Sequence, residues 1–198
     1  FGAHIFQDEM RSEQQALHFY QGGIGLPDRD YYFNNDARTI NIRFEYQKHL
    51  EAMFKLMGDD SLTASKNAAT VFKIESSLAN ASSKLEALRD PYLNYNKMQI
   101  TGLKALTPSI DWQMMLEGMH VFGVDSVIVG QPEFFRETER LLKVYPLNDW
   151  KVYLRWQLIN TFATYLSKPF EDQNFKFYGT VLSGVKVQRP RWKRVLDV

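Results

Sequence analysis

The sequence predicts a mainly α-helical fold, a multi-helix domain fragment with long antiparallel helices and an irregular N-terminal loop region. Two observations support this. From residue 35 onward, apolar residues recur at spacings of three and four, and proline or glycine separates these periodic segments. The 198 residues are 44% hydrophobic and carry a net charge of only +1, a composition typical of a globular domain with a substantial core.

Residues 1–34 show little clean periodicity. Gly22, Gly23, Gly25 and Pro27 interrupt this region, and such residues favour turns and irregular structure. We therefore expect an ordered loop there.

Residues 35–57 predict a helix of about six turns, because Ile42, Tyr46 and Leu50 share one face. Asn34 or Asn35 would cap its start, and Gly58 follows its end.

A second helix is predicted from residue 62 to residue 89. Ser61 or Thr63 would cap it, and Pro91 would end it. Its many alanines allow close approach of another helix, so the two helices are expected to form an antiparallel hairpin.

The remaining sequence predicts further helices, giving six or seven in total and no convincing sheet. The helix capped by Asn148 or Asp149 has the strongest pattern; its apolar face includes Tyr153, Trp156, Phe162 and Leu166, and Lys168-Pro169 would close it. The other segments are a short amphipathic helix after Ser109, a β-branched stretch at 124–128 without an obvious partner strand, a helix from Pro132 to Tyr145, and an aromatic-rich helix at 170–182.

Several kinds of active site find no support. The chain has no cysteine, and none of its four histidines lies three to five residues from another, so no helix offers zinc two imidazoles. Glu86 and Asp90 share a helical face, but Pro91 ends the helix there, and His49 is interpreted as an ordinary helix histidine.

Arg189, Arg191, Lys193 and Arg194 surround Trp192 in one short basic run, which could grip phosphates or stack on a base. The net charge of +1 argues against nucleic-acid binding, because such proteins spread basic residues over a whole face.

No apolar run approaches the roughly 20 residues that span a bilayer. Neither end resembles a natural terminus, so we expect a piece of a longer protein. The compartment is undecided, with the cell envelope, periplasm or secretion favoured over the cytoplasm.

Five ordered blocks resemble the N-terminal domain of the neprilysin and endothelin-converting-enzyme family of zinc metalloendopeptidases. The first is Gly23–Tyr32, which contains Gly-Leu-Pro-Asp-Arg-Asp-Tyr-Tyr. The others are Tyr-Asn-Lys-Met at 95–98 with Pro-Ser-Ile-Asp-Trp at 108–112, Val-Ile-Val-Gly-Gln-Pro-Glu-Phe at 127–134, Trp-Lys-Val-Tyr-Leu-Arg at 150–155, and Leu182 to Arg194 with Arg-Pro-Arg-Trp-Lys-Arg.

The resemblance implies that residues 1–198 belong to the helical lid domain of a peptidase that cleaves oligopeptides. This lid partners a catalytic domain absent from the sequence. The family binds zinc through a His-Glu-x-x-His helix and a later Glu, and no residue here matches these ligands. The resemblance therefore assigns no catalytic or metal residue to this chain. Val195 stands where many animal members have Cys, which fits a bacterial-type member.

Within the lid, Arg29, Asp30, Tyr31, Arg189, Arg191 and Trp192 are the predicted contacts to the catalytic domain or to the cavity. The alternative is a non-catalytic helical module that binds a peptide or protein partner.

Overall fold

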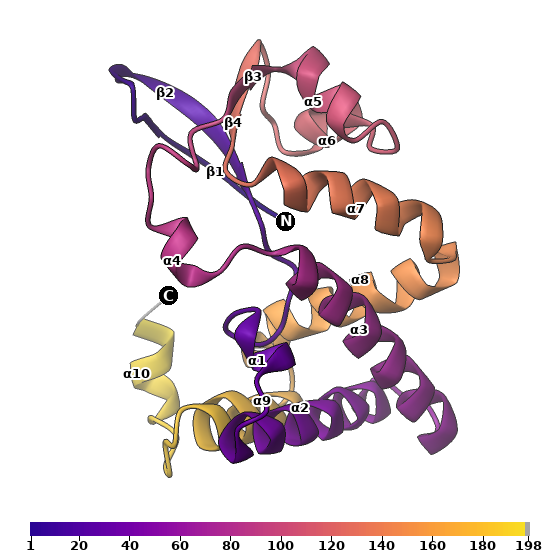
Figure 1. Ribbon diagram of the computed structural model, residues 1–198. Helices are drawn as coiled ribbons and strands as arrows, with labels where there is room; N and C mark the ends of the chain where they lie inside the picture. The colour runs from indigo at the N-terminus through magenta and orange to yellow at the C-terminus, as the bar shows by residue number, and fades with distance from the viewer. Residues whose placement is uncertain (197–198) are drawn as a thin grey trace. The chain divides into compact units, whose positions relative to one another are not determined.

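The first twenty residues form a β-hairpin in the computed structural model, which describes residues 1–196 (Figure 1). Strands β1 (Gly2–Asp8) and β2 (Arg11–Tyr20) pair antiparallel, with Ile5 opposite Leu17. The predicted N-terminal loop is therefore wrong for residues 2–20, whereas residues 21–29, which contain Gly22, Gly23, Gly25 and Pro27, form no helix or strand as predicted. Alternation is absent from the sequence because four successive residues of β2, 16–19, are buried, whereas the distal part of the hairpin is exposed on both faces.

The hairpin belongs to a four-stranded sheet of order β1-β2-β4-β3. Strand β4 (Ser126–Val129) runs parallel to β2, and β3 (Lys97–Gln99) pairs antiparallel with β4. The β-branched stretch near residue 128 thus has partners on both sides. Their distance along the chain explains why the sequence did not reveal the sheet.

Two compact units make up the chain, and each combines two separate stretches of sequence. Unit 1 contains Phe1–Tyr32 and Ile74–Leu147. Its core joins the sheet to two helices, because Phe19 of β2 lies 4.9 Å from Trp112 and 6.4 Å from Phe135 between ring centroids. Its helices are most of α1 (Asp30–Phe33), the second part of α3 (Ser61–Ala81), α4 (Leu85–Leu88), α5 (Ile100–Leu106), α6 (Trp112–Gly118) and α7 (Pro132–Val144).

Helix α3 (Ser61–Ala81) ends well before the predicted residue 89. The Gln21 side chain bonds both backbone groups of Ser83: the Ser83 N–H donates to Gln21 Oε1 at 2.7 Å, and Gln21 Nε2 donates to the Ser83 carbonyl at 3.1 Å. Ser82 is buried and its hydroxyl donates to the Leu78 carbonyl. A contact from Gln21, the residue directly after β2, thus replaces the next helical turn, which local sequence could not show.

Unit 2 contains Phe33–Lys73 and Asn148–Val198. Its helices are α2 (Ala37–Leu56), most of α8 (Leu147–Phe162), α9 (Lys168–Asn174), a π-helix (Phe175–Leu182) and α10 (Arg191–Leu196). The residues that cap α2 and α3 differ from the predicted ones: they are Asp36, one residue after Asn35, and Asp60, one residue before Ser61. Asp36 caps α2 by accepting from the Thr39 N–H, and Asp60 begins α3 by accepting from Leu62 and Thr63.

The expected hairpin of α2 and the first part of α3 is present within unit 2. The Tyr46 and Phe72 rings lie 6.4 Å apart, and these residues are almost equally far from the turn at Gly58, so the two helices run back along each other. Gly58 has a φ of +94°, a left-handed conformation that favours glycine.

The C-terminal helices differ from the prediction in their ends. Helix α8 stops at Phe162, and Pro169 lies in the first turn of α9, where a missing N–H is harmless, instead of closing α8. Tyr153 and Trp156 are buried as expected, but Phe162 and Leu166 are exposed. The aromatic helix is α9 continued by the π-helix, and α10 contains the second half of the basic run.

The mainly helical prediction is confirmed, with ten α-helices among the described residues where six or seven were expected. None of the described helices combines the length and apolar character that crossing a bilayer requires.

Candidate functional site

The Gly-Leu-Pro-Asp-Arg-Asp-Tyr-Tyr segment is held by the hydroxyl of Tyr32. That hydroxyl accepts the N–H groups of Gly25 and Leu26, each at 3.2 Å, and donates to Glu75 Oε2 of α3 at 2.9 Å. Tyr32, Leu26 and Glu75 are all buried. The last Tyr of the motif therefore clamps the loop onto a helix 43 residues away in sequence.

The predicted contact residues Arg29, Asp30 and Tyr31 adjoin this clamp. The Asp28 side chain accepts the Asp30 N–H at 2.8 Å, and the Arg29 carbonyl accepts the Tyr32 N–H at 3.0 Å, which starts α1. All three predicted residues are half-buried. The clamp fixes their backbone in unit 1, and their contacts outside the chain remain a prediction.

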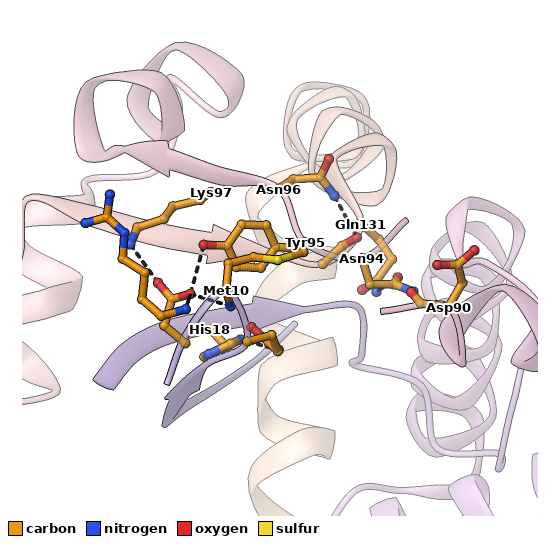
Figure 2. Close-up of polar contacts among 12 residues, drawn as sticks. Met10, His18, Asp90, Asn94, Tyr95, Asn96, Lys97 and Gln131 are labelled. Carbon is orange, nitrogen blue, oxygen red and sulfur yellow. Dashed lines mark hydrogen bonds and ion pairs between the residues drawn. The ribbon is translucent and has the colours of Figure 1, made fainter. Parts of the chain in front are cut away.

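A second cluster joins the hairpin to the Tyr-Asn-Lys-Met block (Figure 2). Asp8 is fully buried, and its carboxylate accepts from Lys97 Nζ at 2.7 Å and from the Tyr95 hydroxyl at 2.9 Å. The backbone N–H groups of Met10 and Arg11 also donate to it. Lys97 is the main reason that the pKa of Asp8 falls to about 2, so the carboxylate stays ionised. Sequence reasoning missed Asp8.

Burial and the hydrogen bond to Asp8 raise the pKa of Tyr95. Its hydroxyl therefore remains a proton donor to the carboxylate at neutral pH. The cluster is an ion pair with satisfied partners, an arrangement that stabilises a loop on a sheet and offers no free nucleophile or base.

A third network anchors the neighbouring loop to the end of the sheet. Gln131 Oε1 accepts the Gln21 N–H at 2.8 Å, and Gln131 Nε2 donates to Asn94 Oδ1 at 2.7 Å. Asn96 donates to the Gly130 carbonyl at 3.3 Å (Figure 2). The Val-Ile-Val-Gly-Gln-Pro block therefore acts as a junction between three segments of unit 1.

The Pro-Ser-Ile-Asp-Trp block has equally specific structural roles. Asp111 caps α6 through the Met114 N–H, and the buried Trp112 donates from Nε1 to Thr107 Oγ1 at 2.8 Å. Ser109 donates its hydroxyl to the buried Glu139 at 2.7 Å. The pKa of Glu139 is lowered: burial opposes the shift, but the bonds from Lys143 and Ser109 outweigh it.

His49 does not fit the expectation of an ordinary helix histidine. It is 1% exposed, it stacks on Phe177 of the π-helix at 5.0 Å, and it meets the Trp156 ring edge-on at 5.5 Å. Gln173 Nε2 lies 3.1 Å from its Nδ1, which makes Nδ1 the acceptor and Nε2 the protonated nitrogen. Burial lowers the pKa of His49 to about 3.

The basic run lies on and before α10. Arg194 pairs with Glu171 and its Nε donates to the Arg189 carbonyl, so part of the run is used within unit 2. Trp192 is 62% exposed, and Lys193 Nζ lies 5.3 Å from its ring centre. Arg189 and Arg191 are exposed, and their predicted contacts are untested.

The resemblance implies zinc ligands that lie outside this chain. Among the described residues, no three His, Asp or Glu side chains come together in a way that could hold a metal ion. His4 and His18 lie 5.1 Å apart, but their rings stack in parallel, so their nitrogens do not converge on one point.

Open pockets occur in unit 1. One of about 560 Å³ lies between α5, α6 and the loop through Phe122, and one of about 880 Å³ lies between Tyr95–Met98, α5 and the start of α7. Both volumes lie within the range of ligand sites in proteins.

The comparisons with known proteins agree along the whole chain. The family model described as Peptidase family M13, for the N-terminal part, matches residues 1–198. Neprilysin-3 of Drosophila melanogaster is 30% identical over 183 residues, covering 87% of this chain and 23% of the relative. Endothelin-converting enzyme 1 of Cavia porcellus is 26% identical, with 98% and 26% covered.

Solved structures show the same fold. The zinc metalloprotease Zmp1 of Mycobacterium tuberculosis in its open state gives a TM-score of 0.92 at 30% identity, covering 99% of this chain and 30% of Zmp1. PepO of Lactobacillus rhamnosis, at 14% identity, shares the fold with a TM-score of 0.78 over 94% of this chain and 30% of PepO. The chain thus spans about a quarter to a third of the length of these relatives, and it belongs to peptidase family M13.

Proposed function

We propose that residues 1–198 form part of the N-terminal helical domain of a zinc-dependent endopeptidase that hydrolyses oligopeptides. The observation that carries this proposal is the whole-chain likeness to Zmp1, a zinc metalloprotease, which also holds for Zmp1 in complex with an inhibitor at a TM-score of 0.91. In such an enzyme, ligands outside these 198 residues would hold the zinc, and the zinc would activate the attacking water.

The role proposed for this chain is to select substrates by size. The described residues supply packed helices, a sheet and satisfied buried ion pairs, which form a stable wall. The pockets of unit 1 have room for peptide side chains. A wall that leaves space for a flexible peptide and none for a folded protein would restrict cleavage to oligopeptides.

The proposed contacts to the catalytic domain are Arg29, Asp30, Tyr31, Arg189, Arg191 and Trp192. The exposure of Trp192 supports this role, because a large exposed aromatic ring is a frequent anchor at interfaces. We also propose an envelope, periplasmic or secreted location, which fractionation of the source cells would test.

The test compares the longer protein that contains this chain with residues 1–198 alone. We expect the longer protein to cleave a short quenched-fluorescence peptide in a zinc-dependent manner and to leave a folded protein intact, while residues 1–198 cleave neither. Cleavage by residues 1–198 would refute the assignment. Peptide binding without hydrolysis by the longer protein would instead support the alternative of a non-catalytic binding module.

Matched variants of the longer protein test the contact residues. Trp192→Ala is expected to change the KM for the peptide or the size limit for substrates. Leu62→Ala is the control, because Leu62 is 81% exposed and lies outside the predicted contacts. Equal behaviour of the two variants would remove Trp192 from the proposal.

A further inference from the structure

Helix α8 carries apolar residues on two opposite sides. One side contains Tyr153, Trp156 and, just past the helix end, Ala163, which are buried in unit 2. The other contains Leu154, Leu158 and Phe162, which are 61%, 59% and 49% exposed. At about 3.6 residues per turn, the spacing of four places the last three in one stripe opposite the buried side.

Two more exposed apolar side chains follow the helix end in sequence, Tyr165 at 64% and Leu166 at 39%. An exposed apolar stripe on a helix often marks a contact site. We call residues 154, 158 and 162 the outer face of α8.

Two cations lie at the start of this face. Lys151 is exposed one turn before Leu154, and Arg155 follows Leu154. The Arg155 guanidinium bonds both carboxylate oxygens of Asp59, at 2.9 and 3.0 Å, and lies 5.6 Å from the Phe54 ring, so Arg155 is used within unit 2. Residues 156–166 carry no charged side chain. A helix with apolar residues on both sides is typical of one that is buried on both sides, and this later part of the face fits an apolar partner.

We propose that the outer face of α8 is an interface for an apolar segment of the same polypeptide that lies outside residues 1–198. The relatives provide the reason to choose this occupant. Residues 1–198 correspond to 30% of Zmp1 and to 26% of endothelin-converting enzyme 1, so most of such a chain is available to cover the face. The inference rests on the longer polypeptide assumed in the proposed function, but it does not depend on peptidase activity.

Thiol labelling in the longer native protein tests this interface. Residues 1–198 contain no cysteine, so Leu158→Cys and the control Ser65→Cys, at an exposed polar residue, each add one thiol to this part of the chain. Labelling by a maleimide is followed at each site by mass spectrometry. We expect Cys at position 158 to react more slowly than the control by roughly tenfold or more, and both to react equally in urea.

Leu154→Cys is a second variant for the case in which Leu158→Cys does not fold. Equal labelling of the face and of the control in the native protein would overturn the proposal. Slow labelling that disappears on dilution, together with a dimer in light scattering, would assign the face to a second copy and would also overturn it. Peptide hydrolysis is measured separately on the longer protein without substitutions. If that protein does not hydrolyse the peptide but Cys at position 158 is labelled slowly, only the proposed function is rejected.

Discussion

Lowering the pH from 7 to 5 is expected to destabilise unit 2 by about 2 kcal/mol, because His49 must stay neutral in the folded chain. Its ring is 1% exposed between Phe177 and Trp156. Burial lowers its pKa from 6.5 to about 3, so a proton binds the unfolded chain before it binds the folded one. The contribution of His49 is complete above pH 6.5 and declines as the pH falls towards 3.

The magnitude follows from proton linkage. At pH 5 the unfolded histidine is largely protonated and the folded one is not, and 1.5 pH units at about 1.36 kcal/mol each give about 2 kcal/mol. Any folded pKa below about 4 gives nearly the same result. The carboxylates with lowered pKa values, such as Asp8 and Glu139, keep most of their contribution down to their ordinary pKa values of 3.8 and 4.5, so between pH 7 and 5 the histidine dominates the change in stability.

Hydrogen exchange of the α2 amides measures this effect locally, after correction for the intrinsic exchange rate at each pH. His49→Gln should remove the dependence on pH, whereas the control His120→Asn, at an exposed histidine, should keep it. Glu45, Lys48 and Lys176 line the neighbouring pocket of about 140 Å³, where Lys48 pairs with Glu45 at 2.9 Å. An opening free energy that is constant between pH 7 and 5, or an unchanged slope in His49→Gln, would refute the reasoning.

Three further perturbations test unit 1. Tyr32→Phe removes a hydroxyl that makes three hydrogen bonds, and it should lower the free energy of unfolding, measured in urea, by about 3 kcal/mol. The control Tyr92→Phe, at a 78% exposed residue, should leave this free energy unchanged. Equal effects of the two variants would contradict the clamp. His120→Gly should stabilise by about 1 kcal/mol, since His120 has a φ of 56°, and a lower melting temperature would contradict this. Lys97→Met should raise the pKa of Asp8 from about 2 towards 3.8, measured by NMR titration of the carboxyl group. The stability that the ionised Asp8 contributes would then be lost at a higher pH on acidification. An unchanged titration midpoint of Asp8 would exclude Lys97 as the cause of its low pKa.

The helices were predictable because their signals are local. The periodicity of residues 37–56 and the proline at position 132 fix two helices almost to the residue. The sheet was not predictable, since β2 meets β4 across about 110 residues and is buried on both faces near Phe19. The end of α3 depends on Gln21, 62 residues from Ser83, and no local pattern contains that contact.

The site residues show the same division. Arg29, Asp30 and Tyr31 were selected from a motif, but the residue that holds this motif in place is Tyr32, whose partner Glu75 lies in another helix. Asp8 gave no signal because a single carboxylate in an irregular stretch has no periodic context. His49 was misjudged because its neighbours in sequence are charged, whereas its neighbours in space are aromatic.

The matched family blocks thus identify a fold more directly than a chemistry. Tyr32, Trp112 and Gln131 each come from a different block, and each uses a buried or half-buried polar atom to join segments of unit 1. Such bonds constrain geometry strongly, because a buried polar group that loses its partner costs about 1–3 kcal/mol. They also require particular residue types at particular positions, which explains why the blocks are recognisable in a chain that supplies no metal ligands among its described residues. A sequence motif in this chain is accordingly better tested by its effect on folding than by its effect on catalysis.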